Sequence, residues 1–484
     1  MSEVQQGKSK VASFIQGSSI LVLSNVCLKA INFFLLPLYT HNLTPEMIGI
    51  SDSVTTLTGV VFPLLTLGLD SAFSAFYFDK EDQDRSRKVF HTLTWAFLVI
   101  GIIPLLLMVF SRPISGMLFH TDGYGYIVSL ALASVTFNLW YLPYSLELRL
   151  ENRMLLFGLS NVIASLSMIL LNILFVSVLK LGEVSLVLST AIVHAESILV
   201  LFLMVKVTPK KTFFDGKLLK KMVRFSVPLI PMTVMMWVLT LSDRYVLLHY
   251  HGSDAVGLYG IGLRFTNLLN VVISAVSMAY TTFAFSSKDD RNAKRMYYYI
   301  FNIESVLLLA VAFTVGLFGK EIIQIMTAEA YATSFEPLRD LMFAQSVYAM
   351  TTIVGYGIYF EKKSVYSFMA VTAGAVLNLG LNFLLIPEYG IRAAALTTLL
   401  GYLLNYFVTL YFSKKVYPCN YGEIRVGIVL AVMYFLCMLG EKLAVPYKIG
   451  LWVACAAGLI IIFRDIIGHM VSLVRTKFMK GRNA

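Results

Sequence analysis

The sequence predicts an all-α membrane protein, a polytopic bundle of about 14 transmembrane helices. Of its 484 residues, 58% are hydrophobic and only 14% are charged, and the mean hydropathy is +0.75. A soluble domain averages about 25% charged residues and under about 50% apolar ones. The apolar runs are long and continuous, without the two-residue alternation of a transmembrane β-barrel. This composition excludes soluble enzymes, nucleic-acid-binding modules and disordered proteins.

The expected spans are apolar runs of roughly the 20 residues that cross a bilayer. Charged stretches and clusters of Pro and Gly separate one run from the next. In chain order the expected spans are residues 14–39, 48–69, 89–110, 126–146, 155–179, 184–205, 225–249, 256–285, 297–318, 337–360, 365–386, 392–412, 425–441 and 449–467.

The distribution of positive charge predicts the orientation of these spans. The chain has 39 Lys and Arg against 28 Asp and Glu, a net charge of +11, and most of the basic residues fall in alternate loops. Basic loops stay on the cytoplasmic side, against the anionic inner leaflet. We therefore expect both termini in the cytoplasm. The polar N-terminus leads into a full span without a small-residue cleavage site, so we expect no removable signal peptide.

Two sequence matches indicate an internal repeat. His41 precedes Gly49 by eight residues, and His249 precedes Gly257 by the same interval. Later, the order Asn, Gly, Thr in spans five and six matches the order in spans eleven and twelve. A parallel repeat predicts two six-helix lobes around a central cavity. The expected parts are an N-terminal lobe (1–206), a cytoplasmic amphipathic linker (207–224), a C-terminal lobe (225–413), and two extra helices with a basic tail (414–484).

Basic side chains inside spans are the first candidates for a binding site, because a charge at mid-bilayer costs about 2.5–3.5 kcal/mol. Lys29 shares a polar stripe of span one with Asn25 and Asn32, at helical spacing. Arg264 shares a stripe of span eight with Asn267. We interpret both stripes as facing the cavity. The alternative is hydrogen bonding between helices, with the charged group reaching an interface.

Other polar residues leave more alternatives open. Asp243 and Arg244 are adjacent in span seven and so point in different directions, which fits a structural pair as well as a ligand site. Asn378 and Asn382 share one face of span eleven, either as interhelical glue or as the lining of a hydrated lumen. Arg339 lies near the start of span ten, and we expect it to anchor that span at the interface.

Acidic residues inside spans are candidates for ion coupling. A carboxylate in the bilayer favours its neutral form, which permits proton binding. The candidates are Glu196, Glu304, Asp70 and Asp243, with Glu196 first because it lies mid-span. A hydrogen bond to a neighbouring helix is the equally weighted alternative for Glu196. The four cysteines form no CxxC motif, and no nucleotide-binding or catalytic signature occurs. We therefore expect no disulfide, no metal, no cofactor and no enzymatic activity.

Several motifs resemble the polysaccharide transporter family, which includes O-antigen and capsule repeat-unit flippases within the multidrug/oligosaccharidyl-lipid/polysaccharide exporter superfamily. The stretch 224–231 reads RFSVPLIP, 241–248 reads LSDRYVLL, and 378–387 reads NLGLNFLLIP. The resemblance covers residues 14–415 and is weak over the last two spans. Relatives often carry an Arg shortly after the segment that matches 68–72, where this chain reads FSAF at 73–76.

The resemblance implies a flippase that moves undecaprenyl-diphosphate-linked oligosaccharide units across the bacterial cytoplasmic (inner) membrane by alternating access. Its implied partners are the lipid-linked substrate, the bilayer, a coupling ion (proton or sodium) and other polysaccharide-assembly membrane proteins, and no nucleic acid. A cationic, Asn-rich cavity suits a diphosphate and a sugar chain. The expected substrate-binding residues are Lys29, Asn32, Arg244, Arg264, Asn267, Asn378 and Asn382.

Three other functions remain as alternatives. A cation or drug antiporter of the same fold would favour acidic and aromatic residues in its cavity, and the basic residues inside spans argue against it. A lipid II flippase is a close variant that sequence separates poorly. A membrane glycosyltransferase or polymerase would need larger outside loops, and the loops here are mostly short.

Overall fold

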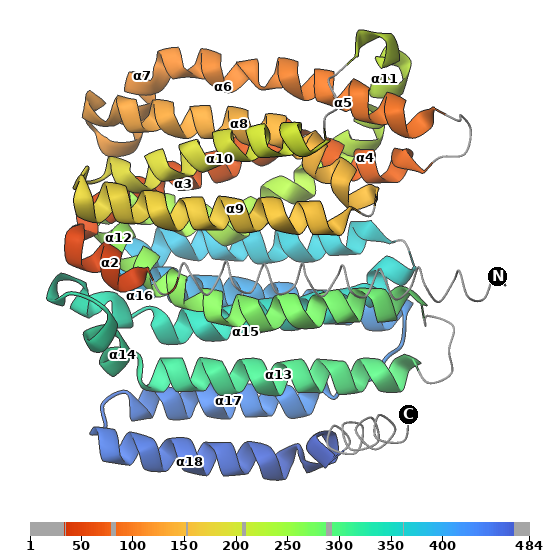
Figure 1. Cartoon of the computed structure of the whole chain (residues 1–484). Helices are drawn as coiled ribbons and strands as arrows, with labels where there is room; N and C mark the ends of the chain where they lie inside the picture. The colour runs from red at the N-terminus through yellow and green to blue at the C-terminus, as the bar shows by residue number, and fades with distance from the viewer. Residues whose placement is uncertain are drawn as a thin grey trace, which may run out of the picture. The chain divides into compact units, whose positions relative to one another are not determined.

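The computed structural model describes residues 33, 35–78, 84–151, 153–205, 210–286, 293–361 and 363–468. Within these ranges every regular element is a helix (Figure 1), which confirms the all-α prediction. Eleven of the described helices are long and apolar enough to cross a membrane. The expected first span, 14–39, lies mostly outside the described residues.

Two of these helical stretches reverse direction at a glycine. Helix α12 (Ile230–Ser286) is interrupted by non-helical backbone at Gly252 (φ 76°). Helix α16 (Ser364–Val416) is interrupted in the same way at Gly390 (φ 55°). Residues with a side chain rarely adopt such positive φ values, which glycine tolerates. A hydrogen bond from Tyr259 to Asp243 joins the two arms of α12. Each stretch therefore supplies two of the expected spans.

The chain divides into two compact units. Unit 1 comprises Met1–Arg264, Thr327–Tyr331 and Leu379–Ala394, and unit 2 comprises Phe265–Met326, Ala332–Asn378 and Ala395–Ala484. The described helices that lie wholly in unit 1 are α2 (Leu36–Asn42), α3 (Pro45–Thr66), α4 (Leu69–Tyr77), α5 (Arg85–Ile100), α6 (Ile102–Leu107), α7 (Ser111–Phe119), α8 (Gly125–Leu150), α9 (Met154–Asn172), α10 (Val184–Val205) and α11 (Gly216–Ser226).

Local sequence explains where α3 begins and ends. Thr44 accepts a hydrogen bond from the backbone N–H of Met47, and Pro45 occupies the first turn, so the start combines a side-chain cap with a residue pre-set for helix. The helix stops at Leu67 and Gly68, which both have left-handed backbone (φ 53° and 67°). Helix α4 then continues the chain and packs against α5, α8 and α11.

The linker forms the expected amphipathic helix, α11. The Asp215 side chain caps it by accepting hydrogen bonds from the backbone N–H groups of Lys217 and Leu218. Leu218 and Met222 are buried, whereas the basic side chains of the helix are exposed. Contacts of α11 with α4 and α5 show where the apolar face packs.

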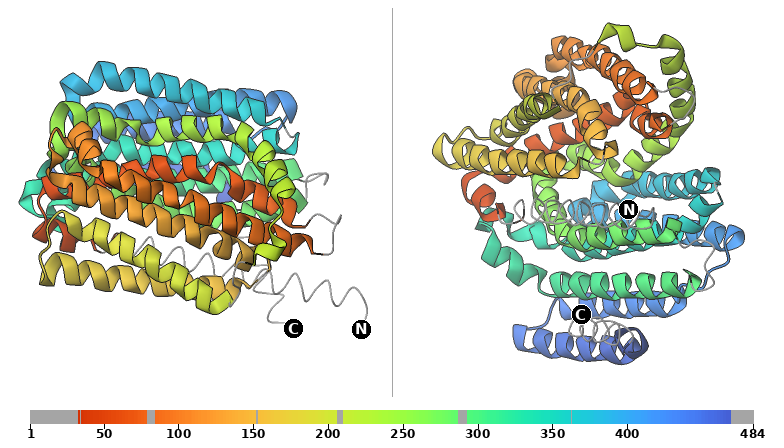
Figure 2. Two further views of the ribbon diagram at one scale, coloured as in Figure 1. Left: turned by 90° about the horizontal axis from the view of Figure 1, so that it is seen from above. Right: turned by 45° about the vertical axis from the view of Figure 1, so that its right-hand side comes forward.

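Unit 2 is built from α13 (Ala293–Leu317), α14 (Gly319–Met326), α15 (Leu338–Phe360), α17 (Glu423–Gly440) and α18 (Val445–Ile462), together with parts of α12 and α16. Helix α13 packs against the other four, and α13, α17 and α18 lie side by side in Figure 1 and in the right-hand view of Figure 2.

Ion pairs tie the last two helices to the rest of unit 2. Arg339 contacts the carboxylates of Asp340 (3.1 Å) and Glu441 (3.0 Å). Lys448, only 1% exposed, contacts Glu321 at 2.8 Å. The sequence predicts that Arg339 anchors its span at the membrane surface, but it does not predict the two carboxylates that Arg339 contacts. The guanidinium connects α15 to the residue that follows α17, because a charge inside a helical bundle needs a counter-ion.

Candidate functional site

Helix α3 and the second arm of α12 cross in backbone contact within unit 1. A Cβ atom placed on Gly49 would lie 1.7 Å from the carbonyl oxygen of Ser253. A Cβ atom placed on Gly257 would lie 1.9 Å from the carbonyl oxygen of Pro45. Ordinary van der Waals contact begins near 3.4 Å. Only glycine therefore fits at either position, and we name these four residues the glycine crossing.

The glycine crossing joins equivalent positions of the two repeats. Gly49 and Gly257 are the glycines that match in the sequence, and Pro45 and Ser253 each precede their glycine by four residues. Each glycine contacts the backbone carbonyl of the residue four positions before the other glycine. Reciprocal contacts of this kind arise where equivalent surfaces meet at a two-fold axis. The geometry supports the internal repeat.

An ion pair lies one turn along from the glycine crossing. An Nη atom of Arg264 lies 3.0 Å from Oδ1 of Asp52, and these side chains are 17% and 19% exposed. Gly260 makes room for the pair, since a Cβ atom there would lie 2.1 Å from the other Asp52 oxygen. The second Nη atom of Arg264 is buried without a hydrogen-bond partner among the described residues. The guanidinium therefore retains donors for a further anion.

Arg244 reaches the same helix one turn further on. Its Nη1 atom donates to the hydroxyl of Thr56 at 3.2 Å, and Thr56 follows Asp52 by four residues on α3. The neighbouring Asp243 is buried and accepts a hydrogen bond from Tyr259. Both predicted arginines of unit 1 therefore contact polar side chains of α3.

Matching asparagines of the two repeats form interhelical hydrogen bonds. Asn172 donates to the hydroxyl of Tyr39 at 2.9 Å. Asn382, at the corresponding place in the second half, donates to the hydroxyl of Ser242 at 3.3 Å. Both asparagines are buried. These contacts correspond to the alternative in which the asparagines hydrogen-bond neighbouring helices and do not line a hydrated lumen.

Further contacts gather at the end of α3 that begins with Pro45, where the predicted topology places the outside. The Tyr331 hydroxyl donates to the carbonyl of Leu43 at 2.8 Å. Burial raises the pKa of Tyr331 above its usual value, so the hydroxyl remains a donor. The Nε2 atom of His251 forms a hydrogen bond with the carbonyl oxygen of Ile386 at 2.7 Å. These bonds hold short connecting segments against the helix ends.

The acidic candidates have different surroundings. Glu196, in unit 1, accepts a hydrogen bond from the Ser167 hydroxyl at 2.8 Å. Asp70 is partly buried in the first turn of α4. Glu304, in unit 2, is 1% exposed, and neither carboxyl oxygen has a hydrogen-bond partner among the described residues. Glu304 is thus the acidic candidate that the structure leaves most isolated.

The remaining predicted residues lie elsewhere. Asn267 accepts a hydrogen bond from Asn270, which in turn accepts one from Gln345 at 2.8 Å within unit 2. Asn378 is buried in unit 2. Lys29 and Asn32 lie outside the described residues. Unit 1 therefore brings together Arg244, Arg264, Asp243 and Asn382, which come from α12 and α16.

Sequence reasoning missed Asp52, the partner of Arg264. It lies inside span two, so the cost of an intramembrane charge was an available signal. Its position three residues after Gly49 was another.

Solved structures with this fold are membrane flippases and transporters. The lipid II flippase MurJ in its inward closed conformation superposes with a TM-score of 0.74, at 16% identity, over 94% of this chain and 100% of that one. An inward-facing MATE family multidrug transporter of the MOP superfamily gives a TM-score of 0.65, at 15% identity, over 84% and 98%. The chain thus shares its fold with these flippase and transporter structures.

The family follows from the sequence itself. The chain belongs to the polysaccharide biosynthesis protein family, whose model matches residues 14–284. The MatE model matches residues 228–384. An uncharacterised membrane protein of Methanocaldococcus jannaschii is 24% identical over 218 residues, which are 43% of this chain and 42% of that protein. These matches confirm the family resemblance.

Proposed function

We propose that the protein is a flippase for undecaprenyl-diphosphate-linked oligosaccharide units, which it moves across the cytoplasmic membrane by alternating access for O-antigen or capsule synthesis. The single observation that carries this proposal is Arg264, whose guanidinium has one partner in Asp52 and uncommitted donors. A diphosphate is the part of such a substrate that hydrocarbon excludes most strongly. A guanidinium binds phosphate oxygens through two parallel hydrogen bonds.

Exchange of counter-ions would couple binding to opening. In the structure, Asp52 on α3 pairs with one Nη atom of Arg264 on α12. A diphosphate carries more negative charge than one carboxylate, so it competes for the same guanidinium. Once Asp52 is displaced, the ion pair no longer draws α3 toward α12 beside the glycine crossing. The helices can then separate, which is the movement that alternating access requires.

The test measures transfer of a lipid-linked oligosaccharide in reconstituted vesicles. Arg264→Ala should abolish transfer, because the anion loses its donor. Asp52→Asn should bind substrate at least as tightly and transfer it more slowly, because the closing ion pair is lost. Asp84→Asn and Arg87→Ala are matched controls, since they break an exposed ion pair in the same unit. Normal transfer by a well-folded Arg264→Ala protein refutes the assignment.

We also propose that proton binding at Glu304 drives transport, which moves this residue ahead of Glu196. An ionised carboxylate in a membrane bundle is costly unless it is paired. On the helices that pack against α13, Arg339 and Lys448 are each held in an ion pair with a carboxylate. Titratable residues on α14, α15, α17 and α18, which pack against α13, are Lys320, Glu321, Arg339, Asp340, Tyr348, Tyr356, Tyr359, Glu423, Arg425, Tyr434, Cys437, Tyr447, Lys448 and Cys455. Tyr280 of α12 also contacts α13, at the ring of Tyr297.

Vesicles with an imposed pH gradient and clamped membrane potential test the coupling. Wild-type transfer should follow the gradient, and Glu304→Gln should transfer substrate without responding to it. Glu196→Gln is the matched control, because its carboxyl group already accepts a hydrogen bond from Ser167. If Glu196→Gln alone loses the response, the coupling residue is Glu196 and our order is wrong.

The match to the MatE model keeps a cation or drug antiporter as the second candidate, and the fold shared with MurJ keeps a lipid II flippase as a variant of the first. Export of a cationic dye by vesicles that fail to transfer oligosaccharide would favour the antiporter. Transfer of lipid II in preference to longer oligosaccharides would favour the variant.

A further inference from the structure

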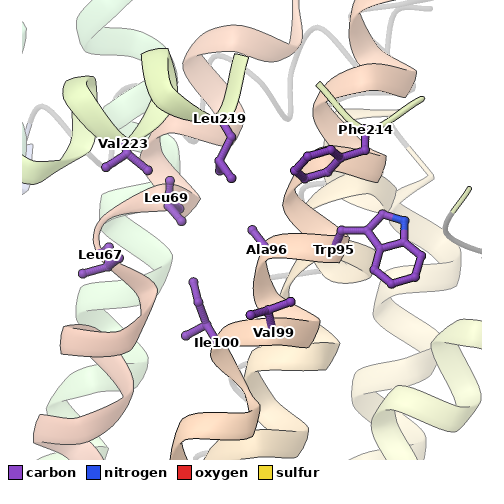
Figure 3. A pocket seen from close by; sticks show the side chains of 9 residues that line it. All are labelled: Leu67, Leu69, Trp95, Ala96, Val99, Ile100, Phe214, Leu219 and Val223. Atoms are coloured by element: carbon purple, nitrogen blue, oxygen red, sulfur yellow. The ribbon is translucent and has the colours of Figure 1, made fainter. Parts of the chain in front are cut away.

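An apolar cavity of about 570 Å³ lies inside unit 1, where α4, α5 and α11 meet (Figure 3). Leu67 and Leu69 line one side, at the turn between α3 and α4. Trp95 and Val99 line another side, one helical turn apart on α5. Leu219 on α11 lines a third side, and its neighbours in the wall are also hydrocarbon. Cavities that bind small ligands have volumes of roughly 300–1,000 Å³.

The left-handed turn at Leu67 and Gly68 helps to shape this cavity. A Cβ atom on Gly68 would lie 3.2 Å from the carbonyl oxygen of Ser226, at the end of α11. The end of the linker helix is therefore close to the turn, and the space remains on the side of α11 that bears Leu219 and Val223.

Cations follow the lining residues along α11. Lys220 follows Leu219, and Arg224 follows Val223. Both are exposed, as is Lys221, and none of the three forms an ion pair with a described residue. The predicted topology places this segment on the cytoplasmic side, where anionic lipids attract basic segments.

We propose that the cavity binds one acyl chain of an anionic phospholipid, whose headgroup lies against Lys220, Lys221 and Arg224. The hydrocarbon lining matches the chain, and the unpaired cations match the headgroup. The polyprenyl chain of a lipid-linked sugar carrier is also hydrocarbon, but it is far longer than the acyl chain of one leaflet. The bound lipid braces the linker helix against α4 and α5. This inference does not depend on the proposed function.

Trp95 provides a native reporter of the occupant. In chains that retain Trp95 alone, with Phe at the other three Trp positions, phosphatidylglycerol brominated on its acyl chain should quench fluorescence strongly. Brominated phosphatidylcholine at the same level should quench less. Chains that retain Trp452 alone are the matched control, because Trp452 is 40% exposed on α18 and lines no part of the cavity. It should be quenched equally by both lipids.

Two variants separate the cavity from the cations. Val99→Phe fills the cavity and should reduce Trp95 quenching by either lipid, whereas Val109→Phe, at an exposed position outside it, should not. Lys220→Gln should weaken the preference for phosphatidylglycerol roughly fivefold, and Arg464→Gln, at an exposed residue beyond α18, should leave it unchanged. Far-UV circular dichroism checks that each variant is folded.

Three outcomes would overturn the proposal. The first is equal quenching of Trp95 by the two brominated lipids. The second is quenching that survives Val99→Phe at full strength. The third is relief of quenching by a small amount of unlabelled polyprenyl diphosphate, which would assign the cavity to the polyprenyl carrier.

Discussion

Substitution of Gly49 by alanine should force the glycine crossing open. The new Cβ atom would lie 1.7 Å from the Ser253 carbonyl oxygen, and ordinary contact begins at 3.4 Å, so α3 and α12 would have to separate by about 1.7 Å. Backbone cannot rotate away as a side chain can. Overpacking of this kind costs about 1–3 kcal/mol. Destabilisation of the closed state alone by this free energy lowers the closed-to-open ratio by roughly 5- to 150-fold.

A buried cysteine can report this opening. Ser53 lies four residues after Gly49 on α3 and is 1% exposed. In a chain without its native cysteines, Ser53→Cys should react slowly with an impermeant maleimide added outside. Adding Gly49→Ala should raise the labelling rate by about the same 5- to 150-fold. Gly257→Ala should act similarly, because its Cβ atom would lie 1.9 Å from the Pro45 carbonyl oxygen.

Gly59→Ala is the matched control for this experiment. Its Cβ atom would lie 3.1 Å from a Leu241 methyl group, and a side chain can move aside. The labelling rate should therefore stay near that of the parent. If the maleimide reacts with Ser53→Cys no faster in the Gly49→Ala chain than in the Gly59→Ala chain, the glycine crossing does not shield position 53. In that case our reasoning fails.

Two further predictions concern the last two helices. Lys448→Ala should destabilise the protein by about 1–3 kcal/mol, because the partly exposed Glu321 loses its partner. Thermal unfolding in detergent should show a clear drop in midpoint, and exposed Lys442→Ala should show almost none. Burial tends to raise the pKa of Asp465, but the hydrogen bond and charge of Arg425 outweigh it and leave the pKa below its usual value. A lowered pKa stabilises the fold above the unfolded-state value, so stability should fall as pH drops through the acidic range, and less so in Asp465→Asn.

The elements that sequence predicted well are those governed by local composition. Apolar runs of bilayer length predict the membrane-spanning helices that the described residues contain. The alternation of basic and apolar residues in 217–224 predicted α11, because an amphipathic helix depends on near neighbours in sequence. The repeat of His and Gly located Gly49 and Gly257, although sequence alone did not show that these glycines contact each other.

The elements that sequence could not predict depend on contacts between distant residues. Arg264 was singled out by its cost in the bilayer, yet its partner Asp52 is 212 positions away. Glu304 and Glu196 looked alike as intramembrane carboxylates. Their difference arises from packing, because the Ser167 hydroxyl reaches Glu196 and no described group reaches Glu304.

The glycine crossing also limits how the two halves of the gene can diverge. At positions 49 and 257, any side chain would collide with the backbone of the other half, so both positions are confined to glycine. Farther along the helices the halves have already specialised. Counted from the glycine of its own repeat, Asp52 corresponds to Gly260, and Arg264 corresponds to Thr56. One half carries the acid and the other half carries the base. The crossing is thus nearly symmetric in its backbone contacts and asymmetric in its charges, so the two halves cannot exchange roles.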